Sequence, residues 1–248
     1  MPRMADDVRD SRSGSGTGDF NGVINLDKPA GVSSARAVDR VKRLLPRGTK
    51  IGHAGTLDPF ATGVLLLLVG RATKACERLM DAPTQYEAAV RFGATTATDD
   101  PEAPAVPWSP AHGGAVVPVP HDRIQPTLAT FVGHILQRPP AFSALKVAGR
   151  RAYDLARRGG EVVLEPRPVK VYGIELLGYE WPVLRLRIDC GRGTYIRAIA
   201  RDLGEKLDVG GHLAELRRTR VGPFAVDTAV APDRLTPDNL ASHLKPPP

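Results

Sequence analysis

Cysteine is scarce in this chain of 248 residues, which has only Cys76 and Cys190. The two form no Cys-x-x-Cys pair, and no secretory segment precedes the first apolar run. A fold that depends on disulfides is therefore excluded, because such folds need several paired cysteines. We expect a protein of the reducing cytoplasm in which both cysteines are small buried side chains.

Long hydrophobic runs are missing as well. The longest apolar stretch, Val64–Val69, lies between Gly63 and Gly70. It is far shorter than the roughly 20 residues that a membrane-spanning helix needs. We therefore expect no membrane association and interpret this stretch as a buried strand.

The sequence also lacks the motifs of nucleotide-driven, hydrolytic and metal-dependent chemistry. It contains no phosphate-binding Gly-x-x-x-x-Gly-Lys-Ser/Thr, no dinucleotide fingerprint after a strand and no Gly-x-Ser-x-Gly elbow. Its histidines have no metal-ligand spacing with one another or with the cysteines. We expect neither a metal ion nor another cofactor.

Positive charge is what the chain has in excess. The formal net charge is +7 and the sequence pI is about 9.7. Because binding to a polyanion releases condensed counterions, this excess favours nucleic acid as the partner. A basic enzyme without a nucleic-acid partner remains the alternative on charge alone.

Composition and spacing predict an α+β protein in three parts. Residues 1–20 are polar and rich in Ser and Gly, so we expect a disordered tail. We expect one domain over residues 21–235 and a short C-terminal extension over 236–248. The mixture of helices and hairpins favours an α+β fold with a mixed, mainly antiparallel sheet flanked by helices.

The expected elements follow from hydrophobic periodicity, caps and breakers. Strands are predicted over residues 21–26, 64–69, 86–92, 169–177 and 183–188. Helices are predicted from Ser33 or Ser34 to before Pro46 and over residues 72–79, 124–135, 150–158 and 195–207, the last capped by Thr194. The proline-rich residues 100–121 are expected to form an irregular surface insertion.

A Gly-rich stretch, residues 52–63, precedes the buried strand and contains Asp58 followed by a proline. It has too many chain breakers to be a regular element, and a loop delivered by a core strand suits chemistry. On these residues alone, Asp58 is more simply a turn former whose side chain bonds a nearby amide. His53 is similarly a candidate surface histidine.

The same stretch, Gly52–Leu65, closely resembles the signature of the TruB family of pseudouridine synthases. Further blocks follow in the family's order, and the resemblance covers residues 22 to about 235. These blocks are Leu26–Ser34, Pro140–Lys146 with Gly149 and Tyr153, Gly193–Arg197, Asp202–Gly204 and Leu216–Arg218.

The resemblance implies a pseudouridine synthase fold with a central RNA-binding cleft, and it makes residues 21–235 the catalytic domain. It also implies a cofactor-free isomerisation of a tRNA uridine, the one numbered 55 in the T-loop, to pseudouridine. It implies that Asp58 is the nucleophile and that Arg197 pairs with it, which would lower the carboxyl pKa and keep it ionised. The remaining implied roles are base stacking by Tyr86, a second pocket tyrosine at Tyr195, occupation of unstacked T-loop space by His53, a pocket wall at Leu216 and a structural motif beneath the pocket at Lys28 and Pro29.

Each of these residues also has a simpler interpretation. Without the resemblance, Tyr86 and Leu216 are core side chains and Arg197 is a solvated surface arginine. Lys146 and the arginines at 150, 151, 157 and 158 suit phosphate contacts, although a run of charge is often only a solvated face.

Two features depart from the family pattern, and two other functions remain open. Residues 98–103 replace an acidic-glycine turn, and the residues after 220 are too few for the usual C-terminal RNA-binding domain. A catalytically silent tRNA chaperone would share the basic surface. A guide-RNA-dependent synthase resembling dyskerin would share the Asp loop, but we expect no guide RNA and a monomer that acts on the T-arm of tRNA.

Overall fold

The structure, a computed structural model, describes residues 20–143, 146–147, 150–151 and 164–248. The predicted tail and most of the predicted helix over 150–158 lie outside these ranges. Arg150–Arg151 forms strand β9, which pairs with β8 (Lys146–Val147). The predicted start of that helix is therefore wrong, because its backbone is extended and bonded to another strand.

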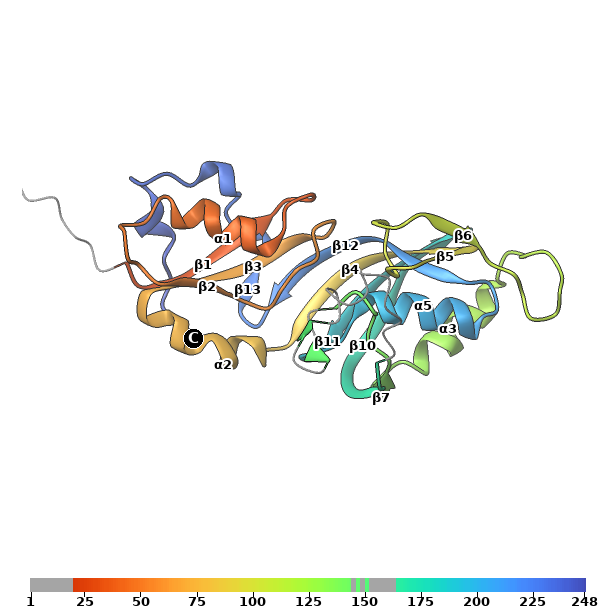
Figure 1. The fold of residues 1–248 in the computed structure, drawn as a ribbon. Helices are drawn as coiled ribbons and strands as arrows, with labels where there is room; N and C mark the ends of the chain where they lie inside the picture. The colour runs from red at the N-terminus through yellow and green to blue at the C-terminus, as the bar shows by residue number, and fades with distance from the viewer. Residues whose placement is uncertain (1–19, 144–145, 148–149, 152–163) are drawn as a thin grey trace, which may run out of the picture.

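A mixed sheet of nine strands forms the centre of the described chain (Figure 1). The strand order is β1-β3-β12-β4-β11-β10-β7, with β2 added beside β3 and β13 beside β12. Every pair is antiparallel except β12 with β3. The strands are β1 (Gly22–Lys28), β2 (Ile51–Ala54), β3 (Thr62–Val69), β4 (Thr84–Phe92), β7 (Gly133–Gln137), β10 (Arg167–Glu180), β11 (Val183–Cys190), β12 (Gly211–Val221) and β13 (Phe224–Ala225).

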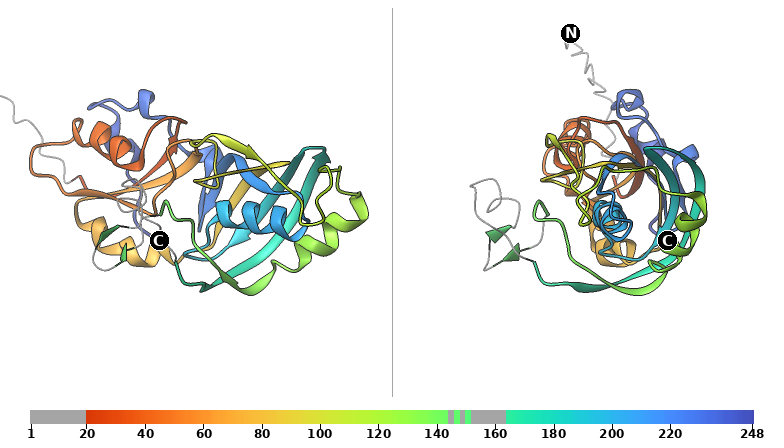
Figure 2. Two further views of the ribbon diagram at one scale, coloured as in Figure 1. Left: turned by 45° about the vertical axis from the view of Figure 1, so that its right-hand side comes forward. Right: turned by 90° about the vertical axis from the view of Figure 1, so that its right-hand side faces the viewer.

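The helices lie on the faces of this sheet, and Figure 2 shows the sheet curving around α5. The predicted α+β fold with a mainly antiparallel sheet is confirmed. That its centre forms an RNA-binding cleft stays a prediction. The described helices are α1 (Ser34–Lys42), α2 (Cys76–Met80), α3 (His121–Ala129) and α5 (Ile196–Lys206), with 3-10 turns at Gly70–Ala75, Val226–Thr228, Pro232–Arg234 and Leu240–His243.

Strand β3 is buried on both faces, which explains its unbroken run of apolar residues. Leu65 and Leu67 face a core formed with α1 and the C-terminal segment. Leu66 and Leu68 face a second core beneath α2. The C-terminal segment continues this packing, since Leu240 is fully buried and the Lys245 carbonyl accepts a 2.7 Å hydrogen bond from the Val23 amide.

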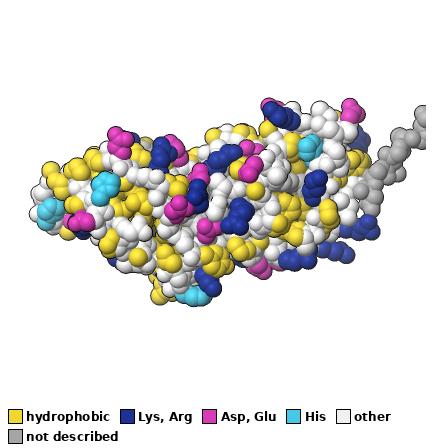
Figure 3. All heavy atoms as spheres, turned by 180° about the vertical axis from the view of Figure 1, so that it is seen from behind, with side chains coloured by type: hydrophobic (Ala, Val, Ile, Leu, Met, Phe, Trp, Pro, Cys, Tyr) yellow, Lys and Arg dark blue, Asp and Glu magenta, His cyan; other side chains and the backbone are white. Residues whose placement is uncertain are grey.

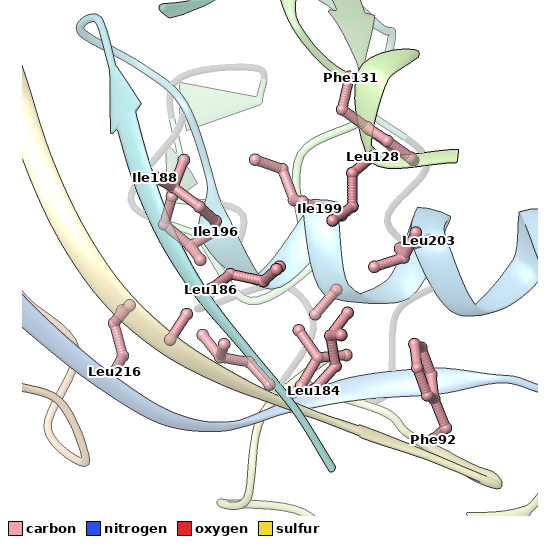
Figure 4. Close-up of a cluster of buried hydrophobic side chains, with 14 of the residues drawn as sticks. Phe92, Leu128, Phe131, Leu184, Leu186, Ile188, Ile196, Ile199, Leu203 and Leu216 are labelled. Atoms are coloured by element: carbon pink, nitrogen blue, oxygen red, sulfur yellow. The ribbon is translucent and has the colours of Figure 1, made fainter. Parts of the chain in front are cut away.

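The largest core lies between α5, α3 and strands β4, β10 and β11 (Figure 4). Leu184, Leu186 and Ile188 of β11 point into it together with Ile199 and Leu203 of α5. Cys190 is buried in the same core, as predicted, whereas Cys76 is only half-buried.

Several element predictions are confirmed, including the strands at β1, β3, β10 and β11 and the first helix, which Ser33 caps by accepting from the Arg36 amide at 3.2 Å. The strand predicted at 86–92 is present as β4. It does not alternate, because the central position of β4 buries neighbouring residues on both faces.

Other predictions are wrong in detail. The helix predicted over 124–135 ends at Ala129, because Gly133 has φ 103° and the following residues pair as β7 with β10. Thr194 does not cap α5, since its hydroxyl donates to the Gly191 carbonyl at 3.0 Å instead. The predicted helix over 72–79 is divided between a 3-10 turn and α2.

The proline-rich insertion is more regular than predicted. Ala105–Pro107 forms strand β6, which pairs with β5 (Ala94–Thr96). Asp208, just after α5, accepts hydrogen bonds from Trp108 Nε1 at 3.2 Å and from the Ala111 amide at 3.1 Å. These contacts tie the insertion to the end of the helix.

Charged side chains on the sheet pair across neighbouring strands. Arg187 of β11 bonds Glu175 of β10 at 2.8 Å and Glu87 of β4 at 3.1 Å, and Arg185 bonds Glu215 of β12 at 3.1 Å. Figure 3 shows both signs of charge interspersed over the middle of the face seen from behind. Among the described residues, no helix has the length and apolar character to cross a membrane.

Gly63 is the point where β3 meets β12 in parallel. Its φ is +101°, and a Cβ there would lie 2.2 Å from the Arg218 carbonyl oxygen. We expect Gly63→Ala to lower the free energy of unfolding by about 3 kcal/mol or more, since both backbone strain and the clash oppose it. Urea unfolding measures this. Gly173→Ala in β10, where a Cβ meets nothing within 4 Å, is the control, and equal losses in both variants would contradict the argument.

Candidate active site

Asp58 lies in the loop that joins β2 to β3, and helix α1 holds this loop from one side. The Ser34 hydroxyl, at the start of α1, donates to the Leu57 carbonyl and accepts from the Leu57 amide, both at 2.9 Å. The Asp58 carbonyl accepts from the Ala61 amide at 3.2 Å. The loop is therefore fixed on both sides of the carboxylate.

Arg218 of β12 holds the same loop from beneath. Its side chain is buried, and its Nε donates to the Val64 carbonyl at 2.6 Å. Its terminal nitrogens donate to the carbonyls of Gly55 at 3.2 Å and Thr56 at 3.4 Å. The parallel contact between β12 and β3 thus carries a buried cation to the base of the Asp58 loop.

Lys28 closes the underside of the loop. Its side chain is fully buried, and its ammonium donates to the carbonyls of Pro29 at 2.8 Å, Val32 at 2.7 Å and Pro59 at 3.1 Å. Burial lowers the pKa of Lys28 to about 8, although nearby Asp58 opposes the change. Lys28 therefore ties the turn after β1 to the residue that follows Asp58, beneath the site, as the resemblance implies.

Replacing Lys28 by methionine should leave these buried carbonyls without their donor. We expect Lys28→Met to lower the free energy of unfolding by about 2–4 kcal/mol, because an unsatisfied buried acceptor costs more than a hydrogen bond adds. Thermal or urea unfolding measures the loss. Lys42→Met, at an exposed position of α1, should change stability by less than about 0.5 kcal/mol. Equal stabilities for the two variants would show that these contacts contribute nothing.

Arg197, in the first turn of α5, faces the Asp58 carboxylate. Its Nε lies 3.1 Å from Asp58 Oδ2, and its Nη2 donates to Oδ1 at 3.3 Å. The Arg197 side chain is 6% exposed and that of Asp58 is 30% exposed. The Asp58 carboxylate is thus partly open to solvent, whereas the guanidinium behind it is not.

The rest of the guanidinium is held by the loop after β5. Its Nη1 donates to Asp100 Oδ2 and to the Thr98 carbonyl, both at 3.0 Å, and its Nη2 donates to the Phe142 carbonyl at 3.0 Å. The Asp100 side chain is 2% exposed. Arg197 therefore lies between two carboxylates, and only that of Asp58 is partly open.

Burial raises the pKa of the Asp58 carboxyl above its ordinary value. Arg197 lowers it, but the neighbouring charge of Asp100 raises it further. Arg197 therefore acts in the expected direction, since its charge lowers the pKa, but the cost of desolvating the carboxylate outweighs the attraction of this partner.

Comparison with known proteins identifies the family of the chain. Residues 42–196 match the family described as TruB family pseudouridylate synthase (N terminal domain), and residues 197–242 match the tRNA pseudouridylate synthase B C-terminal domain. The chain belongs to the TruB family. Similar curated proteins are the tRNA pseudouridine synthases B of Aromatoleum aromaticum, 50% identical over 85% of this chain, and of Mycobacterium sp. strain KMS, 45% identical over 92%.

This TruB-family chain is shorter than its relatives. It spans 66% of the length of the Aromatoleum protein and 76% of that of the Mycobacterium protein. Among solved structures, a Cbf5–Nop10–Gar1 complex has a chain with a TM-score of 0.66 and 31% identity, matched over 91% of this chain and 60% of its own. An H/ACA RNP bound to a substrate RNA containing 2'-deoxyuridine has a chain with a TM-score of 0.61 and 32% identity, matched over 85% and 50%.

The two tyrosines that the TruB resemblance singles out lie near Asp58. Tyr86 of β4 stands opposite Arg218 of β12 in the sheet and packs partly against the largest core. Burial raises the pKa of the Tyr86 phenol, the charge of Arg218 lowers it and the charge of Asp58 raises it. Tyr195 precedes α5. Burial raises the pKa of its phenol, the charge of Arg197 lowers it and the charge of Asp58 raises it. Both phenols are therefore within electrostatic reach of the carboxylate.

His53 and Leu216 lie around the same region. His53, on β2, is half-buried, and no hydrogen-bond partner of its buried Nδ1 is found among the described residues. Burial lowers its pKa and Arg218 adds to this, so the ring is neutral at pH 7. Leu216 of β12 is 7% exposed and packs in the largest core, which suits both a pocket wall and plain packing.

Sequence reasoning gave no role to several residues that build this site. Arg218 was inside a matched motif without an assigned task, and Asp100 fell in the loop that departs from the family pattern. Gln137 is buried and bonds both the amide of Tyr195 at 2.8 Å and its carbonyl at 3.1 Å.

Arg157 and Arg158 lie outside the described residues, and for Lys146, Arg150 and Arg151 the structure describes the backbone alone, so the expected phosphate contacts stay predictions. Within the described part of the chain, no group of three or more His, Cys, Asp or Glu residues could hold a metal ion.

Proposed function

We propose that this chain isomerises uridine 55 in the T-loop of tRNA to pseudouridine, without a cofactor and with Asp58 as nucleophile. The observation that carries the proposal is the partly open Asp58 carboxylate held by a buried Arg197. The TruB membership and the names of the tRNA-modifying relatives support the reaction and the substrate. The proposal concerns the chain of 248 residues.

The reaction needs little from a protein beyond positioning and one nucleophile. The bond between uracil N1 and ribose C1′ breaks, the base turns, and C5 bonds C1′. C5 then loses its proton and N1 takes one up, so the product is an isomer of the substrate. Asp58 attacks either the sugar or the base and is released at the end. Tyr86 stacks on the flipped base, as aromatic side chains do with extruded bases. Tyr195 and Leu216 line the pocket, and His53 fills space vacated by the T-loop.

The partner we propose is the T-arm of tRNA alone, bound by a monomer without a guide RNA. The net charge of +7 favours a polyanion of this kind. We place the catalytic unit at residues 21–235, with 236–248 as a short extension that packs on it, and the protein in the cytoplasm.

The deciding experiment is pseudouridine mapping, by sequencing, in unmodified tRNA incubated with the purified chain and no other macromolecule. Release of tritium from uridine labelled at carbon five gives the rate. We expect product at position 55 only, and none in a tRNA with cytidine there. Binding without tritium release would favour a chaperone, and release only with an added guide RNA would favour a guide-dependent synthase.

Tyr86 provides a test of the stacking role. We expect Tyr86→Ala to raise the activation free energy for kcat/KM by about 1–3 kcal/mol, the usual contribution of one base stacked on an aromatic ring. The ratio of kcat/KM values for the two enzymes measures it. Tyr172→Ala, at an exposed position of β10, is the control for loss of a tyrosine. If Tyr86→Ala reacts as fast as the control, Tyr86 does not stack on the base.

A further inference from the structure

Arg201 lies one helical turn after Arg197 on α5 and is also buried, yet the proposed reaction gives it no role. Its Nη1 is 2.9 Å from Asp99 Oδ2, and its Nη2 donates to the Arg138 carbonyl at 2.7 Å. Its Nε donates to Asp202 Oδ1 at 2.8 Å. The guanidinium therefore joins three segments: α5 itself, the end of β7 and the loop after β5.

The partner of Arg201 has an unusual backbone. Asp99 has φ 59°, in the left-handed region, and its carbonyl accepts from the Leu213 amide at 3.0 Å. A residue other than glycine persists in such a conformation, at a cost of roughly 1–3 kcal/mol, only where its surroundings fix it. The side chains of Asp99 and Arg201 are 13% and 10% exposed, so solvent screens their attraction only weakly.

The turn at Asp99 determines which hydrogen-bond acceptors reach the Arg197 guanidinium. The residues on either side of it, Thr98 and Asp100, both supply acceptors to Arg197 Nη1 at 3.0 Å. The Thr98 hydroxyl donates to Asp100 Oδ1 at 2.5 Å, which fixes the Asp100 carboxylate further. If Asp99 left the left-handed region, these two acceptors would no longer converge on one nitrogen.

We propose that Arg201 is a positioning residue: it holds Asp99 in its left-handed turn, so that Thr98 and Asp100 fix the guanidinium of Arg197 against the Asp58 carboxylate. The inference rests on the proposed function and adds a second ion pair, that of Arg201 with Asp99, behind the site. A purely stabilising salt bridge would change the amount of folded protein and leave kcat unchanged.

The first test replaces Arg201 by glutamine and measures kcat, KM and tRNA affinity with pseudouridine mapping at position 55. We expect kcat to fall about tenfold or more, since a small misplacement of a reacting group is costly. Affinity should stay within about threefold, because phosphate contacts dominate it. Arg185→Gln, which breaks an exposed pair of β11, is the matched control. A kcat equal to that of the control overturns the proposal.

The second test is rescue by glycine. In the double variant Arg201→Gln with Asp99→Gly, glycine adopts positive φ freely and the unpaired carboxylate is gone, so kcat should return to within about threefold of wild type. A double variant as slow as Arg201→Gln overturns the proposal. If Arg201→Gln fails to fold, Arg201→Lys replaces it, because it keeps the buried charge but cannot reach all three acceptors; full kcat in that variant also overturns the proposal.

These outcomes can be distinguished from a failure of the proposed function. A wild-type chain that makes no pseudouridine refutes the function itself. Wild-type turnover with an unchanged Arg201→Gln variant refutes only the positioning role.

Discussion

Asp58→Asn should make no detectable pseudouridine. The amide is nearly the same size as the carboxylate but is a far weaker nucleophile, so we expect the single-turnover rate to fall by about 10⁴-fold or more. The fold should persist, because Arg197 keeps its contacts with Asp100, Thr98 and Phe142. tRNA affinity should change by less than about tenfold, or roughly 1.4 kcal/mol.

The measurement compares tritium release and tRNA binding in the same preparation. Asp81→Asn is the matched control, since Asp81 is an exposed carboxylate paired with Arg192 after α2. It should react at the wild-type rate. Turnover by Asp58→Asn above about one thousandth of wild type would mean that another group performs the covalent step.

Arg197→Lys should have the second largest effect, although it conserves charge. The guanidinium contacts Asp58 through Nε and Nη2 and Asp100 through Nη1, while a single ammonium cannot serve both carboxylates in this geometry. Asp58 would lose one of its two close contacts or Asp100 would lose its only ion pair among the described contacts. We expect kcat to fall by about 100-fold or more, equivalent to about 2.7 kcal/mol, with tRNA affinity nearly unchanged.

Arg185→Lys, in the exposed pair with Glu215, controls for the substitution itself. Single-turnover rates over a range of pH sharpen the comparison. Because a weaker cationic partner raises the pKa of Asp58 further, the fall of the Arg197→Lys rate at the acidic end should begin at a higher pH than that of wild type. Identical pH profiles and rates would show that Arg197 only fills space.

Much of the fold could be predicted from local pattern. The apolar run of β3 and the hairpin of β10 and β11 carry periodicities that strands need. Strand β12, which reaches from β3 to β4, was not predicted, because its residues Gly211–Val221 carry five charged side chains or histidine among the apolar ones. The end of α3 was also missed, since what stops it is the pairing of the next residues with β10, a partner distant in sequence.

For the site, residue spacing alone left Asp58 a turn residue, and the family resemblance gave it a role. What neither could supply is the set of partners that define its environment. Asp100, Arg218 and Lys28 meet at this loop only through tertiary packing. The direction of the Asp58 pKa shift could not be deduced for the same reason, because desolvation depends on how completely the packed chain surrounds the carboxyl.

The Asp58 loop is held by two arginine side chains that come much later in the sequence. Its contact with Arg197 spans 139 residues, and that of Gly55 with Arg218 spans 163. Since a polypeptide emerges from the ribosome with its N-terminus first, the loop is synthesised long before these arginines exist. The environment of Asp58 is therefore completed late in synthesis: a nascent chain of which only the first half has emerged contains the carboxylate but not yet Arg197.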